Sequence, residues 1–550
     1  MIEKIPQPAV AATQDSSVPP LVAAMMQAAF YADPCAEVEL KQTHISYVFL
    51  AGDYVYKLKK PVRFRFIDCS RLDQRCHFCL EEVRLNSRLS PEVYLGVFAI
   101  IRRDGGFALG PKVQGEHPEA VEYVVAMRRL PENRMLDRLV AAGAVDRAKI
   151  RALAAKIAAF HAAASTERSW NYGNAPELWR AVTADIAESV GFLGDTLEKE
   201  QLAEIDAFCQ AFIGSHWKHL NRRAHDGRVR EGHGDLRAEH VCMRDDTIDI
   251  IDCVEFNARL RYGDVASELA FLAMDLERLG APLLADELVD SYMAESSDAD
   301  LVQFIPFYKC YRAYVRGKVE SLRSRESEVS AVQREHARTL ARGYFNLACR
   351  YARLGSPALV VVCGLVGTGK STLVRLLQKR LGFKAISSDE VRKRLAGVSP
   401  NQRMISAYGA GIYSSSFSKV TYQTMIDDAE RVLREGAGVI VDATFKRAAD
   451  RSDIMSLAER LNVPVLFIEC VAPKEEIMQR LDRRSESLNE TSDATFEVYQ
   501  AQSREFEPLI EIPSSNHLVV DSTRDPAKVG REIESSLQRL TRFRASPRAR

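Results

Sequence analysis

A short glycine-rich segment directly after an apolar run constrains this 550-residue chain more than any other feature. Residues 358–363 read Ala-Leu-Val-Val-Val-Cys, and residues 364–372 read Gly-Leu-Val-Gly-Thr-Gly-Lys-Ser-Thr. The second segment fits the pattern G-x-x-x-x-G-K-[ST], in which glycines let backbone N–H groups surround phosphate oxygens. The apolar residues that follow have helical spacing, and the positive N-terminal end of a helix favours an anion. The sequence therefore predicts a strand, a phosphate-binding loop and a helix, in that order.

The positions of this phosphate loop (residues 364–372) have individual expected roles. We expect the ammonium group of Lys370 to contact the terminal phosphates, which also makes it a candidate catalytic residue. The Ser371 hydroxyl is a candidate ligand of Mg²⁺. The alternative is a glycine-rich turn that binds no phosphate. The residues predicted to bind ATP in this loop are Gly364, Val366, Gly367, Thr368, Gly369, Lys370, Ser371 and Thr372.

The bulk composition bounds the class of protein. A chain of 550 residues is too long for a single core and indicates two or three domains. Lysine plus arginine equals aspartate plus glutamate at 75 each, so no general field attracts nucleic acid or an anionic membrane. No apolar run approaches the roughly 20 residues of a membrane span, and the N-terminus lacks a signal-peptide pattern. Eleven scattered cysteines suit a reducing compartment, so we expect a cytoplasmic protein.

The chain changes pattern several times along its length. Short strand-like runs fill about 35–130 and mostly helical patterns fill about 131–354, so we expect one domain over 25–354 with two lobes. A helix stop at Gly355-Ser356-Pro357 marks the boundary to a second domain over 357–538. Strands and helices alternate there, which predicts a parallel sheet wrapped by helices. The expected strands lie near 359–363, 383–387, 438–442, 465–470 and 517–521, and the expected disordered tails are 1–20 and the basic segment 539–550.

Two carboxylates follow predicted strands of the second domain. Asp442 ends a buried-strand run, where it could hold Mg²⁺ near Ser371; the alternative is that it caps the next turn. Asp389 follows the second strand, and ligands of open parallel sheets lie beyond the carboxyl ends of strands. A carboxylate there could accept the proton of an attacking hydroxyl, which makes Asp389 a candidate catalytic base. The alternative is a capping box of Ser387 and Glu390 in which Asp389 only favours the helix N-terminus.

Three arginines, at 480, 483 and 484, precede the polar stretch 485–492, which we interpret as a mobile lid. Arginines that close over the phosphates would neutralise charge in the transition state, so Arg480 and Arg484 are predicted to bind ATP. Arg480 also stands four residues after Glu476, and the alternative for it is a solvated helix pair.

Residues 358 to about 535 resemble the P-loop small-molecule kinases, a group that includes gluconate kinase-like and zeta-toxin-like proteins. The resemblance implies ATP with Mg²⁺ as the phosphoryl donor and a hydroxyl group as the acceptor, without identifying that acceptor. The matching pieces are the phosphate loop, Ser388-Asp389-x-x-Arg392-Lys393, Val441-Asp442-Ala443-Thr444-Phe445 with Arg451, and Ser492-Asp493-Ala494.

A second set of residues suited to phosphate chemistry lies in the first two-thirds of the chain. Residues 233–240 read His-Gly-Asp-Leu-Arg-Ala-Glu-His, and Asp252 follows a short apolar strand. Asp235 and Asp252 could flank a metal–phosphate site, one accepting a proton and the other binding Mg²⁺. Lys57 lies on an otherwise apolar strand, and Glu81 or Glu82 on the next helix could pair with it. For each residue alone, a solvated surface position is the alternative.

Residues from about 35 to 300 resemble the aminoglycoside phosphotransferase group within the protein-kinase-like fold. By this resemblance Asp235 is the catalytic base, Asp252 is the Mg²⁺ ligand, and Lys57 with Glu82 clamps the α-phosphate. The segment Val125-Ala126-Met127 would be the hinge that receives adenine through backbone groups.

Two departures from the family pattern concern this first site. His240 stands where the family usually has asparagine, and an imidazole is a poor ligand for Mg²⁺, so His240 is only a weak metal candidate. No G-x-G-x-x-G motif precedes Lys57, and only a strand pair around Gly52 is expected there. A pseudokinase that binds a nucleotide without turnover is therefore the alternative to an active N-terminal site.

One cysteine cluster has spacing reminiscent of zinc sites. Cys69, Cys76, His77 and Cys79 lie close in sequence, but no second Cys or His pair follows at finger spacing. Because the cluster opens a helical pattern, we predict buried, apolar cysteine side chains.

The two resemblances together are those of a bacterial fusion of a phosphotransferase-like domain and a P-loop kinase. We expect a bifunctional ATP-dependent kinase acting on hydroxyl groups of small molecules, with the P-loop half the more certain catalyst. One alternative is a regulatory switch, in which a pseudokinase senses a ligand and the P-loop domain hydrolyses ATP slowly. Another is a kinase of nucleic-acid 5′-hydroxyl ends, against which the zero net charge counts. We expect a small-molecule substrate as partner, and neither a membrane nor nucleic acid.

Overall fold

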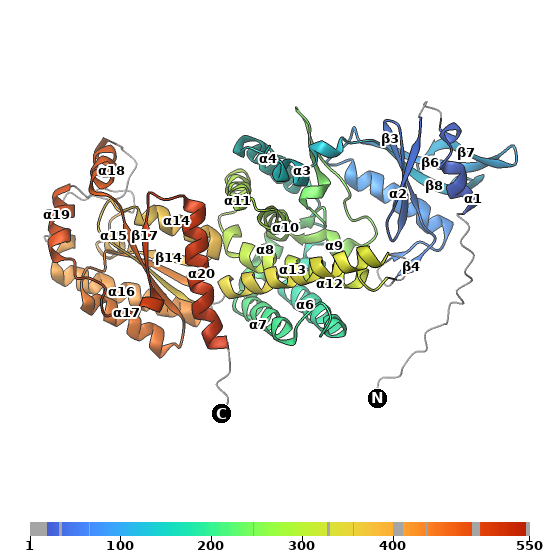
Figure 1. The fold of residues 1–550 in the computed structure, drawn as a ribbon. Coiled ribbons are helices and arrows are strands. Elements are labelled where there is room, and N and C mark those ends of the chain that lie inside the picture. The colour runs from blue at the N-terminus through green and yellow to red at the C-terminus, as the bar shows by residue number, and fades with distance from the viewer. Residues whose placement is uncertain are drawn as a thin grey trace, which may run out of the picture. The chain divides into compact units, whose positions relative to one another are not determined.

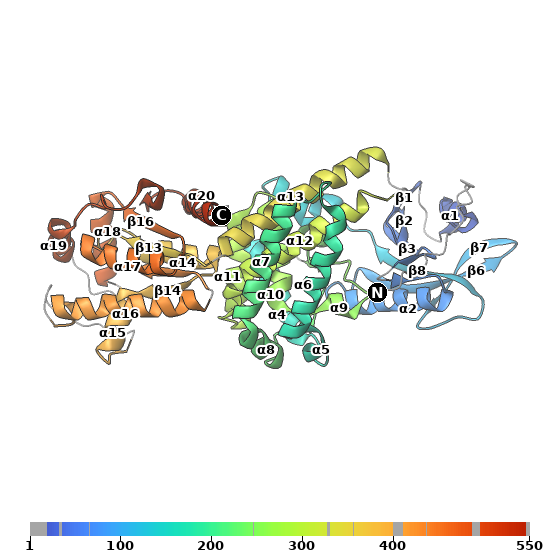
Figure 2. The same cartoon turned by 90° about the horizontal axis from the view of Figure 1, so that it is seen from below.

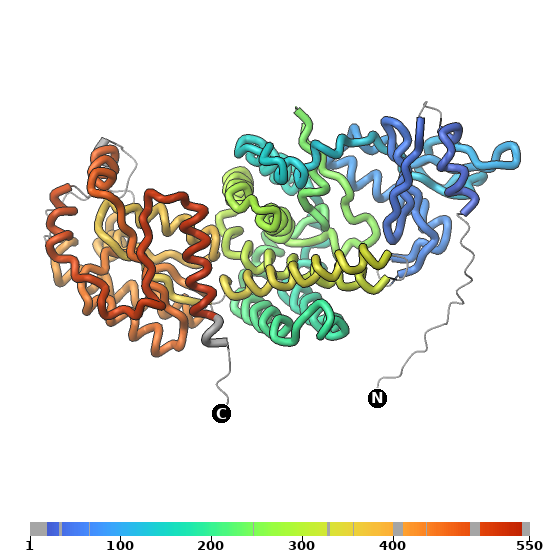
Figure 3. Tube along the Cα trace, in the orientation of Figure 1, coloured from blue at the N-terminus to red at the C-terminus, as the bar shows by residue number. Residues whose placement is uncertain are grey.

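The computed structural model describes residues 19–31, 36–64, 67–245, 247–326, 330–355, 357–399, 411–435, 437–486 and 496–545, traced in Figure 3. The chain forms two compact units. The first comprises residues 1–138 with 239–261, and the second comprises 139–238 with 262–550. The second unit thus contains both the helical segment and the parallel sheet, across the boundary expected at residues 355–357. Most of the expected N-terminal tail, and most of the expected lid, lie outside the described residues.

An antiparallel six-stranded sheet forms the core of the first unit, in the order β1-β2-β3-β8-β6-β7 (Figure 1). Helix α2 packs against β6 and β8, where Cys76 and Cys79 lie among apolar side chains of the sheet. Cys69, Cys76 and Cys79 are all buried, which confirms the predicted apolar role. The elements are α1 (Pro20–Met25), β1 (Val38–Gln42), β2 (Ser46–Ala51), β3 (Tyr54–Lys59), β4 (Arg63–Phe64), β5 (Ile67–Asp68), α2 (Leu72–Asn86), β6 (Tyr94–Arg103), β7 (Gly106–Val113), β8 (Ala120–Arg128), β10 (Val241–Met243), β11 (Ile248–Ile250) and α9 (Ala258–Arg261).

Helices dominate the first part of the second unit, as the pattern of residues 131–354 predicts. Helix α12 packs along α13, and α10 packs against α11 and α12 (Figure 2). A two-stranded antiparallel ribbon of β9 and β12 flanks the loop that carries Asp235. The elements are α3 (Leu136–Ala141), which begins in the first unit, α4 (Arg147–Ala163), α5 (Ser169–Gly173), α6 (Ala175–Ser189), α7 (Lys199–Ser215), α8 (Trp217–His225), β9 (Val229–Glu231), β12 (Tyr262–Asp264), α10 (Val265–Arg278), α11 (Pro282–Ser296), α12 (Ile305–Arg323) and α13 (Ala331–Gly355).

A five-stranded parallel sheet in the order β14-β15-β13-β16-β17 fills the rest of the second unit. All five strands lie within one residue of their predicted bounds. Apolar runs rich in β-branched residues mark the strands at 359–363 and 439–442, which are covered on both faces. The elements are β13 (Leu359–Cys363), α14 (Lys370–Leu381), β14 (Lys384–Ser387), α15 (Ser388–Leu395), α16 (Ser415–Arg434), β15 (Val439–Asp442), α17 (Ala448–Arg460), β16 (Val465–Val471), α18 (Lys474–Glu486), α19 (Phe496–Glu505), β17 (His517–Asp521) and α20 (Pro526–Ala545).

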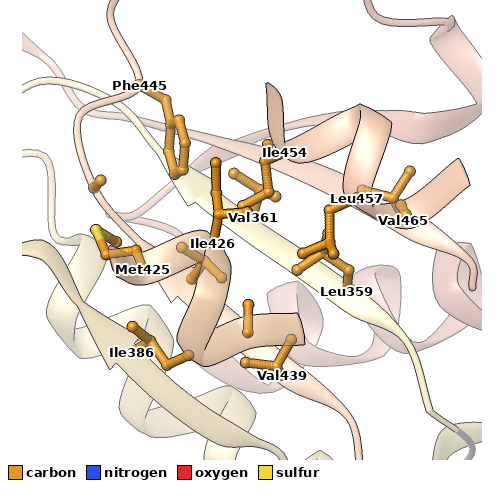
Figure 4. Close-up of a cluster of buried hydrophobic side chains, with 14 of the residues drawn as sticks. Leu359, Val361, Ile386, Met425, Ile426, Val439, Phe445, Ile454, Leu457 and Val465 are labelled. Carbon is orange, nitrogen blue, oxygen red and sulfur yellow. The ribbon is translucent and has the colours of Figure 1, made fainter. Parts of the chain in front are cut away.

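Alternate residues of the central strands point to opposite faces of this sheet and build two cores. On one face Leu359 and Val361 pack with Ile426 of α16 and Leu457 of α17 (Figure 4). On the other face Val360 and Val362 pack with residues of α14 and α20, among them Leu377 and Leu537. Helices on both faces leave the carboxyl edge of the sheet as the exposed place for a site.

The final helix is longer than expected. Helix α20 continues to Ala545, so the prediction of disorder is wrong for residues 539–545. The reason is packing, since Leu540 continues the apolar face that Leu537 begins and contacts the same core. The five residues after Ala545 lie outside the described part of the chain.

Charged side chains fix the far end of α14, the helix that follows the phosphate loop. Arg380 is 5% exposed and forms ion pairs with Glu534 of α20, at 2.8 Å, and Asp286 of α11, at 3.2 Å. Glu534 also pairs with Arg350 of α13, at 2.6 Å. The phosphate-loop helix is thereby tied to the helical part of the second unit. Nowhere in the described chain is a helix both long and apolar enough to cross a membrane.

Candidate functional site

The phosphate loop adopts a backbone that two of its glycines make possible. Gly364 has a φ of +133°, and a Cβ there would lie 2.4 Å from the carbonyl oxygen of Cys470. Gly369 has a φ of +96°, and a Cβ there would lie 3.0 Å from Nη1 of Arg480. Both positions combine a left-handed backbone with a crowded approach, so the loop requires glycine at each.

Backbone donors of the loop remain available for an anion. Within the described chain, no group accepts the N–H of Gly367, Gly369, Lys370 or Ser371. The Lys370 ammonium donates to the carbonyl oxygen of Leu365, at 2.9 Å, inside the same loop. Converging N–H groups at a helix N-terminus form the concave site that phosphates occupy.

Two further residues of the loop that are predicted to bind ATP have contacts that shape the loop. The Val366 N–H donates to the side-chain oxygen of Gln502 in α19, at 3.1 Å. The hydroxyl of Thr368, which is buried, donates to the carbonyl oxygen of Leu365, at 2.7 Å. Thr372 lies in the first turn of α14 with Ser371, and both are exposed.

Asp442 ends β15 as a buried carboxylate with one unsatisfied oxygen. Its Oδ1 is fully buried and has no hydrogen-bond partner in the described chain. The pKa of Asp442 is raised to about 6, chiefly by burial; the charge of Lys370 opposes this rise, and the carboxylates of Asp389 and Glu390 contribute to it. A desolvated carboxylate oxygen without a partner is costly unless a cation is present. Asp442, with the hydroxyl of Ser371, therefore has the oxygen ligands that suit Mg²⁺.

Asp389 lies in the first turn of helix α15, which Ser387 caps. The backbone N–H of Asp389 donates to Oγ of Ser387, at 3.3 Å, and the predicted capping box with Glu390 is not among the contacts of the described residues. The cap does not use the carboxylate of Asp389, which is 43% exposed and accepts a hydrogen bond from Nη1 of Arg392, at 3.4 Å. Ser387 therefore caps the helix, and the carboxylate of Asp389 stays accessible to a substrate.

A cavity of about 370 Å³ lies beside the phosphate loop. Arg480 and Arg483 line it, and Nη1 of Arg480 donates to Oγ of Ser522, at 2.8 Å, while its Nε pairs with Glu476, also at 2.8 Å. The predicted helix pair thus coexists with a position at the cavity. The side chain of Arg484 lies outside the described residues.

Sequence reasoning missed the polar lining residues Ser522 and Arg524 of this cavity. They follow β17, the last strand of the sheet, and the residues directly after each strand of a parallel sheet share one edge. The sequence analysis considered the residues after the strands that precede Asp389 and Asp442. The same consideration of the residues after the last strand would have identified Ser522 and Arg524.

In the first unit, Lys57 joins the two carboxylates predicted for it. Its ammonium lies 2.8 Å from Oε1 of Glu82 and 2.9 Å from Oδ1 of Asp252. Burial lowers the pKa of Lys57, but Asp252, Glu82 and Glu255 outweigh it and hold that pKa well above its usual value. The pairing resolves the choice left open between two glutamates, since Glu81 pairs with Arg84 on the helix surface instead.

A second lysine of β3 completes this cluster and was not predicted. Lys59 is fully buried between Glu82, at 2.8 Å, and Glu255. It stands two residues after Lys57 on the strand, so both ammonium groups face the same side of the sheet. Glu82 therefore binds one lysine through each of its oxygens. The strand periodicity signalled Lys59, whereas nothing local signalled Glu255, which is 196 residues away in the chain.

His240, the weak metal candidate, and Met127, the last residue of the predicted hinge, also lie in the first unit. His240 places its Nε2 atom 3.7 Å from Oδ2 of Asp252, next to the proposed metal ligand. Met127 lies inside β8 between β3 and β6, opposite Val55 and Tyr94. Residues 125–127 therefore belong to a central strand that pairs on both sides, and the predicted hinge around them that receives adenine stays a prediction. A hollow lined by Asp53 and residues 129–133 lies just after this strand.

Asp235 belongs to the second unit, where helix α10 holds its loop. Glu268 of α10 accepts the N–H of Gly234, at 2.5 Å, and Asp275 accepts the N–H of Ala238, at 3.0 Å. Burial alone would raise the pKa of Glu268, but hydrogen bonds from His161 and the loop lower it to about 2. The loop is thus fixed by buried carboxylates.

The Asp235 side chain itself is engaged at two points. Its oxygens accept from Nε and Nη2 of Arg237, at 3.0 and 2.8 Å. This leaves the carboxylate 26% exposed, so it is oriented without being enclosed.

Comparison with known proteins agrees with this division of sites. The model of a phosphotransferase enzyme family matches residues 53–301, and the model of an AAA domain matches residues 359–509. Uncharacterized proteins of Mycobacterium tuberculosis (strain H37Rv) and Mycobacterium bovis are each 30% identical over 465 residues, which cover 84% of this chain and 89% of theirs. The shikimate kinase of Thermodesulfovibrio yellowstonii is 26% identical over 137 residues, 23% of this chain and 77% of that enzyme.

Among solved structures, a sugar kinase from Janibacter is 20% identical and has a TM-score of 0.25, covering 33% of this chain and 94% of its own. The phosphotransferase model and the antiparallel sheet give the first part an aminoglycoside phosphotransferase-like fold, and the phosphate loop with its parallel sheet gives the last part a P-loop kinase fold. In this chain an aminoglycoside phosphotransferase-like domain therefore precedes a P-loop kinase domain. The chain is a phosphotransferase and belongs to the same family as the mycobacterial proteins.

Proposed function

We propose that the P-loop half is an ATP-dependent kinase that transfers the γ-phosphoryl group to a hydroxyl group of a small molecule. The supporting observation is one arrangement at the carboxyl edge of the sheet. Free N–H groups of the phosphate loop, the unsatisfied oxygen of Asp442 and the accessible carboxylate of Asp389 occur together there. The charge of Asp389 contributes to the raised pKa of Asp442, so the two groups are electrostatic neighbours.

The residues present account for each part of such a transfer. Asp389 accepts the proton of the acceptor hydroxyl while that oxygen forms a bond to the γ-phosphorus. The bond from the γ-phosphorus to the bridging oxygen breaks, and ADP leaves with that electron pair. Lys370 and Arg480 offset the negative charge of the phosphates. Mg²⁺ bound by Ser371 and Asp442 would supply further charge neutralisation for the phosphate oxygens.

The cluster around Lys57 supports a second nucleotide site in the N-terminal half. Lys57 is held by Glu82 and Asp252, which is the arrangement that an α-phosphate clamp beside a metal ligand requires. The oriented carboxylate of Asp235 would accept the substrate proton. His240 beside Asp252 is the feature that favours the pseudokinase alternative, since an imidazole binds Mg²⁺ poorly.

Labelled ATP separates these functions. The full-length protein is incubated with γ-labelled ATP and a small-molecule pool, alongside Lys370→Ala, Asp235→Ala and the double variant. We expect Lys370→Ala to abolish most transfer, because the lysine contacts the phosphates. Transfer that survives Lys370→Ala and disappears in Asp235→Ala would assign the activity to the N-terminal half instead. ATP hydrolysis without transfer, unchanged by Asp389→Asn, would favour the regulatory switch.

A further inference from the structure

Arg312 of α12 is a partly buried arginine whose hydrogen-bond partners in the described chain are all neutral. Its Nε donates to Oγ of Ser267 in α10, at 3.0 Å, and its Nη1 lies at the long distance of 3.5 Å from the carbonyl oxygen of Gly234, directly before Asp235. Helices α10 and α12 pack against each other (Figure 2), and the guanidinium carbon lies 5.0 Å from the centre of the Phe271 ring. A guanidinium group has five N–H donors and a permanent charge, so this environment leaves it without a counter-charge.

Arg223 of α8 shows how the helical part of the second unit satisfies an arginine that has a structural role. Arg223 is 3% exposed, and its three nitrogen atoms donate to the carboxylates of Asp264 and Asp298, at distances from 2.7 to 2.9 Å. Its guanidinium carbon lies 4.8 Å from the centre of the Phe304 ring. An aromatic ring thus supports both arginines, but within the described chain Arg312 lacks the two anions that Arg223 has. Structural support therefore accounts for Arg223 and not for Arg312.

The carboxylates around the Asp235 loop are each engaged with another group. The pairs are Asp235 with Arg237 at 2.8 Å, Asp275 with Arg278 at 2.8 Å, Glu320 with Arg316 at 2.6 Å, and Glu268 with His161 at 2.8 Å. Asp275 and Glu268 also accept N–H groups of the loop. The positive charge of Arg312 therefore remains in excess beside the proposed proton acceptor.

A second arginine of α12, Arg316, lies one turn further along the helix and has an unused donor. Its Nη2 donates to Glu320, at 2.6 Å, but its Nε is fully buried and has no hydrogen-bond partner in the described chain. Its guanidinium carbon lies 5.7 Å from the centre of the Tyr344 ring of α13. Burial raises the pKa of Tyr344, and the positive charges nearby, among them Arg316 and Arg237, oppose the rise. Arg316 and the loop that carries Arg237 thus lie close to the same ring.

We propose that Arg312 and Arg316 bind an anionic group of the acceptor of the N-terminal half, while the hydroxyl of that acceptor faces Asp235. This inference rests on the proposed second site and names its substrate class. Two guanidinium groups one helical turn apart suit a carboxylate or a phosphate, which accepts charge-assisted N–H bonds from both. The same groups would repel a polycationic acceptor, and a neutral acceptor would leave Arg312 without a counter-charge. The substrate class is therefore hydroxylated organic acids and phosphate esters, whose shared chemistry is an anion near a hydroxyl.

The test uses the full-length protein carrying Lys370→Ala, so that only the N-terminal half transfers phosphate. A small-molecule extract freed of nucleotides is separated by ion exchange at neutral pH into anionic, neutral and cationic pools. Transfer from γ-labelled ATP is measured with each pool and with glycerate, glycerol 3-phosphate, glycerol and the amino alcohol serinol. Arg312→Gln, Arg312→Lys and Arg316→Gln are compared with Arg338→Gln, which changes an arginine of α13 that pairs with Glu335.

The inference predicts transfer to the anionic pool, and glycerate and glycerol 3-phosphate distinguish a carboxylate from a phosphate as the preferred anion. Arg312→Gln should lower acceptor kcat/KM by about 10- to 100-fold, the range for a lost hydrogen bond to a charged group. Arg312→Lys should fall in between, since it keeps the charge and loses the paired geometry. Arg316→Gln should lower kcat/KM by up to about tenfold, because Glu320 already engages part of that guanidinium. The KM for ATP should not change, and Arg338→Gln should match the parent protein.

Transfer only to the neutral or cationic pool would overturn the inference and leave the second kinase site standing. A loss confined to the KM for ATP would overturn it as well, because the arginines would then serve the nucleotide. If no pool accepts label from the Lys370→Ala protein, the proposed second kinase site fails, and this inference fails with it. Arg316→Gln keeps the test decisive if Arg312→Gln does not fold.

Discussion

Lys59 and Glu82 form an ion pair in which neither side chain reaches solvent, at 0% and 1% exposure. The other oxygen of Glu82 holds Lys57, so one carboxylate positions both lysines of the strand. Isolated charges this deeply buried are strongly disfavoured, and the pair persists because each charge has its partner. The position of the proposed phosphate clamp therefore depends on a lysine whose side chain is not exposed to solvent.

Replacing Glu82 should destabilise the protein far more than replacing its neighbour. Glu82→Gln leaves Lys57 and Lys59 without their common anion, and breaking such a buried pair costs about 3–5 kcal/mol. The matched control is Glu81→Gln, because Glu81 forms only a surface pair with Arg84 and should cost roughly 0.5 kcal/mol or less. Equilibrium unfolding in urea measures the free energy of unfolding of both variants. Equal costs for the two variants would show that the buried pair is not ionised.

A methyl group at Gly369 should block nucleotide binding. Its Cβ would lie 3.0 Å from Nη1 of Arg480 and from Ser522, at a φ of +96°. We expect Gly369→Ala to weaken ATP affinity at least about tenfold, equivalent to roughly 1.4 kcal/mol, measured by calorimetry. Gly343→Ala on α13 is the control, since nothing lies within 4 Å of its Cβ. The control should keep its ATP affinity, and unchanged affinity in Gly369→Ala would argue against this loop as the binding site.

Asp442→Asn should separate the binding of ATP from its dependence on Mg²⁺. The amide keeps the size of the side chain and removes the charge that suits a cation. With EDTA present, ATP affinity should be equal to or higher than that of the parent, because one negative charge near the phosphates is gone. The enhancement of affinity by Mg²⁺ should largely disappear. Retention of full enhancement in titrations of ATP with and without Mg²⁺ would remove Asp442 from the metal site.

The pH dependence of stability should report the same carboxylate. The pKa of Asp442 is raised by burial from 3.8 to about 6, so its stabilising contribution is complete below about pH 4 and is lost as the pH rises through 6. Relative to Asp442→Asn, the nucleotide-free parent should lose on the order of 2–3 kcal/mol between pH 4 and pH 7. Urea unfolding at a series of pH values measures this difference, and a constant difference would contradict the raised pKa.

The contribution of Glu268 to stability should depend on pH with the opposite sign. Hydrogen bonds lower its pKa from 4.5 to about 2, so its contribution is present above pH 4.5 and is lost as the pH falls through 2. Glu268→Gln should therefore cost on the order of 3 kcal/mol at pH 7 and progressively less below pH 4.5. Acid-induced unfolding monitored by circular dichroism checks the trend. A cost that stays constant down to pH 2 would indicate that the lost interaction is packing and not charge.

The sequence predicts the parallel sheet well and the cluster around Lys57 only in part. The run Leu359–Cys363 is apolar on both faces and ends at a glycine motif, so its structure is specified locally. The cluster around Lys57 includes Glu255, which lies 196 residues from Lys59 in the chain, so only the tertiary fold brings these two residues together. The lysine-rich composition of residues 57–60 favours a solvated strand end, and the contacts of Lys59 with Glu82 of α2 and with Glu255 reverse this.

The central strand that contains residues 125–127 and the extended final helix have related causes. Val125 and Met127 are apolar residues that fit either a central strand or its exit, and pairing on both sides decides for the strand. The arginines after Leu537 suggest a disordered basic tail, but Leu540 falls on the apolar face of the preceding helix turns. In both cases the deciding contact lies on another element, beyond the reach of a local pattern.

The attachment of Arg380 has a consequence for any attempt to divide this chain. A fragment starting after Pro357 would retain Glu534 but discard Asp286, and with it one of the two anions that balance a desolvated cation. The partner fragment would in turn keep Arg350 without Glu534. Cleavage at residues 355–357 would thus remove an ion-pair partner from each fragment, so the P-loop domain and the helical segment before it depend on each other electrostatically.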